Sequence, residues 1–321
     1  MNILEVRDLR VYFFTRRGVV KAVDGVNFYV RPKETLGLLG ESGSGKSVTC
    51  LSILRLISEP PGRIVGGTIV FNGEDLLDKS KQEMTRIRGR ELFMVLQDPL
   101  TSLNPAFSIG YQLRESINIA EEIKGKSLAY KASHLLEVVS IPSPEVVLHQ
   151  FPHELSGGMR QRVIGAMSLA GDRKLLIADE PTTSLDVTTQ AQYLRLIKKL
   201  QEERGMSVIF VTHDFGIVAN VCDRVAVMYA GKIVEQAEIF ELFDRPLHPY
   251  TVALMKSVPS AEFKVERLDS IDGQPPDPIN FPPGCSFHIR CKTLCDDRCS
   301  INFPPVVKIT DNHEVSCWKY V

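Results

Sequence analysis

The sequence predicts an α/β fold organised around a phosphate-binding loop between a buried parallel strand and a helix. The first observation is the pattern Gly-x4-Gly-Lys-Ser at 40–47, which directly follows the apolar run 36–39. The second is that further apolar runs, at 91–96, 174–178 and 207–211, end at polar or charged residues. Ligands of open α/β sheets bind at the carboxyl ends of such strands.

Length and composition limit the function classes. With 321 residues, of which 44% are hydrophobic, the chain can form one large or two ordinary domains around a buried core. A formal charge of −1 provides no basic field for nucleic acid. No apolar run approaches the roughly 18 to 20 residues that span a bilayer, and residues 1–8 form a charged strand pattern rather than a signal peptide. We therefore expect a cytoplasmic protein that binds no nucleic acid.

The loop at 40–47 is predicted to cradle phosphate. Its glycines let successive backbone N–H groups converge on one anion, and the following helix adds the positive end of its dipole. Lys46 can reach the β- and γ-phosphates of a nucleotide, and the Ser47 hydroxyl can bind Mg²⁺. A flexible Gly/Ser turn is the alternative, which the flanking strand and helix disfavour.

Residues 1–35 alternate between apolar and polar in short runs, which predicts an antiparallel β layer with a hairpin loop at 15–18. The aromatic residues at 12–14 offer a stacking platform for an adenine ring. A core role fits their spacing equally well.

Several polar groups follow predicted strands. Gln97 can orient a water or complete a Mg²⁺ shell, although Gln before Asp-Pro is also a common turn residue. Asp179 can hold Mg²⁺ through water, and Glu180 can polarise an attacking water, with an acidic turn as the alternative. His213 also follows a predicted strand and would lie at the same carboxyl edge of the sheet as these residues. We therefore interpret it as a γ-phosphate contact, although a single His is usually structural.

Residues from about 104 to 165 are polar with helical periodicity and predict a helical insertion, with amphipathic stretches near 108–124 and 126–140. It closes at Ser156-Gly157-Gly158, where Ser156 is a plausible N-cap and the glycines expose backbone N–H groups. We expect a second anion-binding helix start there.

Together these motifs resemble the ATP-binding subunit of an ABC transporter. The resemblance rests on six motifs in order, namely Walker A at 40–47, the Q-loop Gln97, the signature at 155–161, Walker B at 175–180, the D-loop at 184–186 and the switch His213. The stretches 97–105, 178–187 and 248–251 and the cysteine-containing tail further resemble the dipeptide and oligopeptide importer branch, which includes nickel importers.

The resemblance implies a P-loop NTPase of ABC type with an antiparallel β subdomain. Its nucleotide-binding domain would span 1–255, with the helical subdomain at about 104–165, and a C-terminal extension would span 256–321. ATP and Mg²⁺ are the implied ligands, with Gln97, Glu180 and His213 as catalytic residues. The implied Mg²⁺ ligands are Ser47, Gln97 and Asp179. The nucleotide-binding residues are predicted to be Phe13, Gly40, Ser42, Gly43, Ser44, Gly45, Lys46, Ser47, Val48, Gln97, Asp179, Ser156 and Gly158.

The resemblance also implies partners. ATP at Lys46 of one chain would be closed over by Ser156 and Gly158 of a second ABC subunit, either a related chain or another copy, in a head-to-tail dimer. Two membrane permease subunits and an extracytoplasmic binding protein would complete an importer of di- and oligopeptides, with this chain at the cytoplasmic face of the membrane. Nickel or another small solute is the alternative cargo.

Other classes fit less well. A soluble repair ATPase would need a long coiled-coil insertion, and a translation factor would carry two cassettes. A scaffold that binds nucleotide without hydrolysing it would be expected to lack Glu180 or His213.

The tail concentrates five of the seven cysteines between 285 and 317, in a proline-rich segment without a periodic apolar face. Such clustering in a cytosolic chain favours a metal over disulfides. Zinc on the short spacings 291–295 and 295–299, an iron cluster and unmetallated thiols are the alternatives.

The family resemblance points to a 4Fe-4S cluster in this tail. Its implied ligands are Cys285, Cys291, Cys299 and Cys317. Cys295 is then an additional thiol, and the position of Pro304 favours Cys299 over Cys295 as the third ligand.

Overall fold

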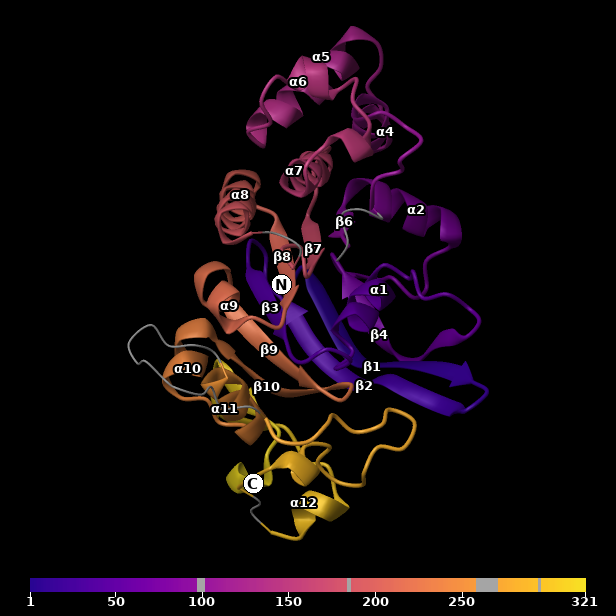
Figure 1. Cartoon of the computed structure of the whole chain (residues 1–321). Helices are drawn as coiled ribbons and strands as arrows, with labels where there is room; N and C mark the ends of the chain where they lie inside the picture. Colours follow the sequence, from indigo (N-terminus) through magenta and orange to yellow (C-terminus); the bar gives the residue numbers. More distant parts are fainter. Residues whose placement is uncertain (97–101, 184–185, 258–270, 294–295) are drawn as a thin grey trace. The chain divides into compact units, whose positions relative to one another are not determined.

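The structure is a computed structural model that describes residues 1–96, 102–183, 186–257, 271–293 and 296–321 (Figure 1). The chain divides into two compact units. Unit 1 comprises Met1, Arg31–Glu34 and Asp78–Val211, and unit 2 comprises Asn2–Val30, Thr35–Leu77 and Thr212–Val321. Among the described residues, no helix combines the length and apolar character needed to span a membrane.

Unit 1 combines parallel strands with a group of helices. The strands are β6 (Leu92–Val95), β7 (Leu175–Asp179) and β8 (Ser207–Thr212). β7 pairs in parallel with both β6 and β8, and every residue of β7 and β8 is buried. Parallel strands covered on both faces are continuously apolar, which explains why the sequence shows runs rather than alternation.

The helices described in unit 1 are α2 (Lys81–Arg90), α4 (Ile109–Glu121), α5 (Lys126–Val138), α6 (Pro144–Val147), α7 (Gly157–Ser168) and α8 (Val187–Arg204). Four of them, α2, α4, α7 and α8, begin at side-chain caps. Ser80, Ser108, Ser156 and Asp186 each accept a backbone hydrogen bond at a helix start. The helices α4 to α7 lie close to the range that the sequence predicts to be helical (Figure 1).

Unit 2 contains a four-stranded antiparallel sheet in the order β2-β1-β4-β5. Its strands are β1 (Leu4–Thr15), β2 (Gly18–Val30), β4 (Gly62–Phe71) and β5 (Glu74–Asp75). β1 and β2 form the expected hairpin, which turns between Thr15 and Gly18. Inward-facing Val, Leu and Ile side chains of this sheet are fully buried, consistent with one face packed on a core.

A second group of strands in unit 2 runs in the order β11-β12-β10-β9-β3. The strands are β3 (Thr35–Leu39), β9 (Arg224–Tyr229), β10 (Lys232–Glu238), β11 (Val307–Thr310) and β12 (His313–Val315). β3 pairs with β9 in parallel, and the other pairs are antiparallel. The helices of unit 2 are α1 (Lys46–Ile53), α9 (Phe215–Val221), α10 (Ile239–Asp244), α11 (Pro249–Lys256) and α12 (Arg298–Ile301). The described strands and helices therefore match the predicted α/β class.

The end of the tail adds two strands to this group. β12 pairs with β10, with Val315 opposite Glu235, and Val315 and Cys317 pack with Leu247 in a small apolar cluster. The expectation that residues 285–317 lack a periodic apolar face is therefore wrong near their end. Strands of three or four residues contain too few side chains for alternation to be visible in the sequence.

A buried carboxylate ties the tail to this sheet. Glu235 is fully buried, and its oxygens accept hydrogen bonds from the backbone N–H groups of Leu247 (2.7 Å) and His248 (2.9 Å). The same carboxylate lies 2.8 Å from Nε2 of His313 on β12. Glu235 therefore links β10, the start of α11 and the tail.

We predict that Glu235→Gln lowers the free energy of unfolding by about 2 to 4 kcal/mol, because an amide nitrogen cannot accept from a backbone N–H and His313 would lose a charged partner. Denaturant unfolding followed by circular dichroism measures this change. Glu241→Gln is the control, since its carboxylate lies farther from His313, at 3.5 Å, and is partly exposed. Equal destabilisation by both variants would contradict the assignment.

Candidate functional site

The phosphate-binding loop of unit 2 packs so tightly that two of its glycines cannot be replaced without displacing backbone. A Cβ atom on Gly40 would lie 2.2 Å from the carbonyl oxygen of Met228 on β9. A Cβ atom on Gly45 would lie 2.4 Å from the carbonyl oxygen of Ala22 on β2. The backbone φ angle of Gly45 is 105°. At these two positions the backbone of the loop packs directly against β9 and β2, and a residue with a side chain would not fit there.

Lys46 is the first residue of α1 and is almost fully buried. Its Nζ atom donates to the carbonyl oxygens of Gly40 (2.7 Å) and Glu41 (2.9 Å), so the ammonium folds back over its own loop. Nearby, the carbonyl of Ser44 accepts from Gly231 N–H, while the buried Ser44 hydroxyl has no hydrogen-bond partner among the described residues. A phosphate oxygen is a suitable partner for such a hydroxyl.

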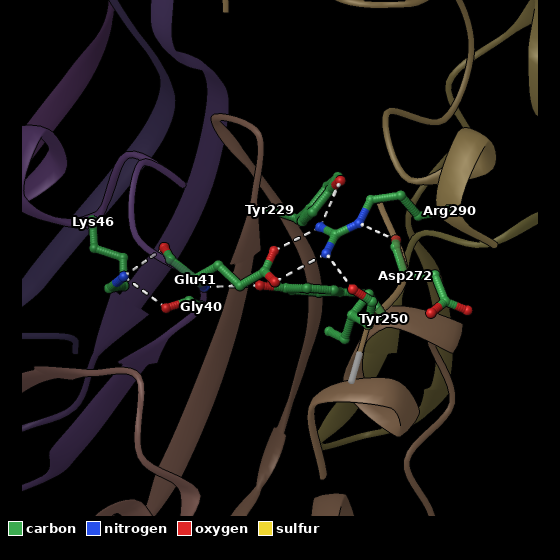
Figure 2. Close-up of polar contacts among 8 residues, drawn as sticks. Gly40, Glu41, Lys46, Tyr229, Tyr250, Asp272 and Arg290 are labelled. Atoms are coloured by element: carbon green, nitrogen blue, oxygen red, sulfur yellow. Dashed lines mark hydrogen bonds and ion pairs between the residues drawn. The ribbon is translucent and has the colours of Figure 1, made fainter. Parts of the chain in front are cut away.

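Glu41 connects this loop to the tail (Figure 2). Its carboxylate forms a two-pronged ion pair with the guanidinium of Arg290, at 2.7 Å to Nη1 and 3.1 Å to Nη2. Its backbone N–H donates to the hydroxyl of Tyr250 at 2.8 Å. Burial raises the pKa of Tyr250, so this phenol stays neutral and can accept that hydrogen bond.

Two carboxylates end strand β7 in unit 1. Asp179 is buried at the end of the strand, and the half-buried Glu180 follows with a φ of 44°. The Glu180 N–H donates to the carbonyl of Val211 at 3.0 Å, and its carboxylate accepts from the hydroxyl of Thr183 at 3.1 Å. Positive φ is uncommon for a residue with a side chain and is concentrated at functional sites.

Helix α7 of unit 1 begins as the sequence predicts. The Ser156 hydroxyl accepts from Met159 N–H at 3.3 Å, which makes it the N-cap, and Ser156 and Gly157 are exposed. A Cβ atom on Gly158 would lie 2.8 Å from a methyl carbon of Thr189, so the helix start is also close to α8.

The structure also places Phe13 and His213, two further residues that the sequence predicts to contact nucleotide. Phe13 is half-buried on β1, with its ring over Gly62, while Tyr12 beside it donates to Asp24 at 2.7 Å. Burial together with that hydrogen bond raises the pKa of Tyr12 to about 12. His213 is exposed between β8 and α9. Gln97, in the Q-loop, and residues 184–185 of the D-loop lie outside the described residues.

The four cysteines proposed as ligands line one small cavity in unit 2. Cys285, Cys291, Cys299 and Cys317 share it with His248 and Trp318. Burial, and secondarily the neighbouring thiols, raises the pKa of Cys285 to about 11. Within the described parts of the chain, no three His, Cys, Asp or Glu side chains form a group that could hold a metal ion. Cys295 lies outside those parts.

His248 lines the same cavity and carries a buried donor without a partner among the described residues. It is 1% exposed, and its Nδ1 accepts from Tyr250 N–H at 3.1 Å, which places the proton of the neutral ring on Nε2. Burial lowers the pKa of His248 to about 4, so the ring is neutral near pH 7. Nε2 is buried without a hydrogen-bond partner among the described residues. His248 therefore has a buried N–H group for which the described residues provide no acceptor.

Comparison with known families identifies the fold and the loop. Residues 23–183 match the ABC transporter family, and residues 234–299 match the C-terminal region of oligopeptide/dipeptide transporters. The chain belongs to the ABC transporter family. The chain is 51% identical to the oligopeptide transport ATP-binding protein OppD of Bacillus subtilis, over 99% of this chain and 88% of that protein. It is 45% identical to the dipeptide transport ATP-binding protein DppD of the same organism, over 99% of this chain and 94% of that protein.

Solved structures of ABC cassettes have the same fold. The dimeric bacterial ABC transporter cassette MJ0796 matches 74% of this chain and 98% of its own, at 25% identity and a TM-score of 0.66. The cassette cbiO1 of Clostridium perfringens matches 76% of this chain and 91% of its own, at 27% identity and a TM-score of 0.65. As a member of the ABC family, the chain is an ATPase, and ATP with Mg²⁺ is the expected ligand of the loop.

Sequence reasoning missed the residues that support the loop from outside. Tyr229 carried no motif, Arg290 entered only as part of the cysteine-containing tail, and Tyr250 only as part of the stretch 248–251. The one available signal for Arg290 was its position next to Cys291, which does not indicate a partner 249 residues away.

We predict that Lys46→Ala weakens ATP binding by about 10- to 100-fold, the loss expected for a charge-assisted hydrogen bond to phosphate. Isothermal titration of ATP into the purified protein measures this change. Lys308→Ala, which removes an exposed lysine on β11, is the matched control and is expected to bind ATP normally. Unchanged affinity of the Lys46 variant would show that the ammonium does not contact the nucleotide.

Proposed function

We propose that this chain hydrolyses ATP to drive the import of di- and oligopeptides through membrane permease subunits, at the cytoplasmic face of the membrane. The observation that carries the proposal is the buried Lys46 held over a glycine loop in which a Cβ atom on Gly40 or Gly45 would clash with a backbone carbonyl. The cargo is inferred from the match of residues 234–299 and from the printed names of the relatives. Nickel or another small solute is the alternative cargo.

Each predicted residue has a chemical role in this proposal. The loop N–H groups and Lys46 bind the β- and γ-phosphates, with Phe13 against the adenine. Ser47, Asp179 and Gln97 hold Mg²⁺, which neutralises charge on the phosphate oxygens when bound. Glu180 acts on the attacking water, either as the general base that accepts its proton or as a group that polarises it. His213 contacts the γ-phosphate.

The exposed start of α7 supports a head-to-tail dimer. Ser156 and Gly157 are exposed, so the N–H groups at this helix start are available to an anion outside the chain. We propose that they close over ATP bound at Lys46 of a second ABC subunit, which is a related chain or another copy. Two permeases and, indirectly, an extracytoplasmic binding protein complete the system.

Glu180→Gln is predicted to retain ATP binding and to slow turnover by on the order of 10²-fold or more, the scale of a positioned general base. Steady-state phosphate release measures turnover, and titration of ATP measures binding. Cells that carry only this variant should lose uptake of a labelled oligopeptide.

Glu203→Gln, a change on the exposed part of α8, is the control and should leave both turnover and ATP affinity unchanged. Near-normal hydrolysis by the Glu180 variant would remove that residue from its role. Normal hydrolysis by the wild-type protein without peptide uptake in cells would instead contradict the cargo.

We also propose that Cys285, Cys291, Cys299 and Cys317 bind a 4Fe-4S cluster. Support comes from the cavity that they share and from the His248 N–H, which needs an acceptor that a cluster sulfur would provide. A single zinc ion requires all four sulfurs within about 2.3 Å of one point. In a cubane each cysteine binds a different iron, so the four sulfurs need not meet at one point.

Purified without oxygen, the protein is predicted to be brown and to contain about four irons per chain. Iron should be lost in Cys285→Ser, Cys291→Ser, Cys299→Ser and Cys317→Ser. Cys295→Ser is the matched control and should retain it. Stoichiometric zinc without iron would overturn the assignment, and loss of iron from the Cys295 variant alone would show that the third ligand is wrong.

A further inference from the structure

Arg290 uses all five of its N–H donors within unit 2. Nη1 donates to Glu41 and to the Tyr229 hydroxyl (3.3 Å), and Nη2 donates to Glu41 and to the carbonyl of Ile271 (3.4 Å). Nε donates to the carbonyl of Asp272 at 3.1 Å. The side chain is only 3% exposed, so these contacts replace water completely. A guanidinium fork satisfies this arrangement, whereas lysine, with three donors on one atom, does not.

The other end of this ion pair belongs to the phosphate-binding loop (Figure 2). Glu41 directly follows Gly40, and its carbonyl oxygen is one of the two that hold Nζ of Lys46. Its carboxylate and its carbonyl therefore join Arg290 of the tail to Lys46 within a single residue. Displacement of Glu41 would simultaneously shift a Lys46 partner and leave the buried Arg290 charge without its carboxylate, which is strongly unfavourable.

We propose that Arg290 is a positioning residue for the phosphate cradle. Through Glu41 it fixes the loop segment that holds Lys46, so the cysteine-containing tail and the bound nucleotide stabilise each other. Coupling between two binding regions is reciprocal, so ATP must favour the ordered tail by the same factor by which the ordered tail favours ATP. The inference rests on the proposed binding of ATP at Lys46.

A purely structural ion pair would behave differently. Such a pair would hold the tail onto unit 2, and its removal would lower stability without changing the affinity of a correctly folded chain for ATP. The distinguishing quantity is therefore the dissociation constant for ATP, measured on folded protein, together with its dependence on Glu41.

The first experiment is a double-mutant cycle on ATP affinity with Arg290→Gln, Glu41→Gln and the double variant, measured by isothermal titration. Each single change is expected to raise the dissociation constant about 5- to 30-fold, within the usual range for coupled sites. The double variant should bind ATP no more weakly than the single variant with the lower ATP affinity. The reason is that either single change already removes the same ion pair. Arg290→Lys should fall between the wild type and Arg290→Gln.

Lys308→Gln, which removes an exposed tail charge, is the matched control and should bind within twofold of the wild type. Unchanged affinity in folded Arg290→Gln, or losses that add in the double variant, would overturn the inference. Where Arg290→Gln does not fold, Glu41→Gln, at a partly exposed position, carries the test.

The second experiment measures the hydrogen exchange of the tail instead of the affinity for the nucleotide. Hydrogen exchange of peptides within 271–293 is followed by mass spectrometry with and without Mg-ATP, with hydrolysis blocked by Glu180→Gln in every sample. ATP is expected to slow exchange in the chain with Glu41 and Arg290 intact, and to have no such effect after Glu41→Gln at saturating ATP. Equal protection in both would overturn the inference. Failure of the parent chain to bind ATP would instead count against the proposed function.

Discussion

Glu41 is the residue on which the phosphate-binding region depends, because three different groups meet its three polar parts. Its N–H is held by Tyr250, its carbonyl by Lys46 and its carboxylate by Arg290. A loop that cradles an anion must present its backbone N–H groups to the anion, so its position depends on polar contacts as well as on packing. The contacts to the N–H, the carbonyl and the carboxylate of Glu41 fix this position.

The two buried cations of this region are held in different ways. Two carbonyl oxygens of the loop accept hydrogen bonds from the Lys46 ammonium and orient it over the loop. Arg290 is instead matched by a carboxylate in the two-pronged geometry that suits a guanidinium. The charge of Arg290 is therefore neutralised within unit 2, where this side chain supports the loop.

The sequence allowed prediction of the parts that depend on local patterns. The loop at 40–47, the buried strands and the N-cap Ser156 all follow from glycine spacing, apolar runs and capping chemistry, and the structure places them accordingly. The pairing of β12 with β10 and the contact between Glu41 and Arg290 could not be predicted. Both join residues far apart in the chain, and a single Arg or a three-residue strand carries no signal of its partner.

The tail is held by contacts with several parts of unit 2, and these contacts bear on the role of its cysteines. β12 extends the sheet next to β10, Glu235 binds His313, and Arg290 binds Glu41, so packing and polar contacts hold both ends of residues 285–317. The order of this segment therefore does not depend on a metal cluster alone. One of the groups without a partner among the described residues is the Nε2 atom of His248, a residue that lines the same cavity as the four cysteines. A cluster there would complete an already anchored segment, and because Cys291 directly follows Arg290, it would also restrain the chain next to the contact that reaches the phosphate-binding loop.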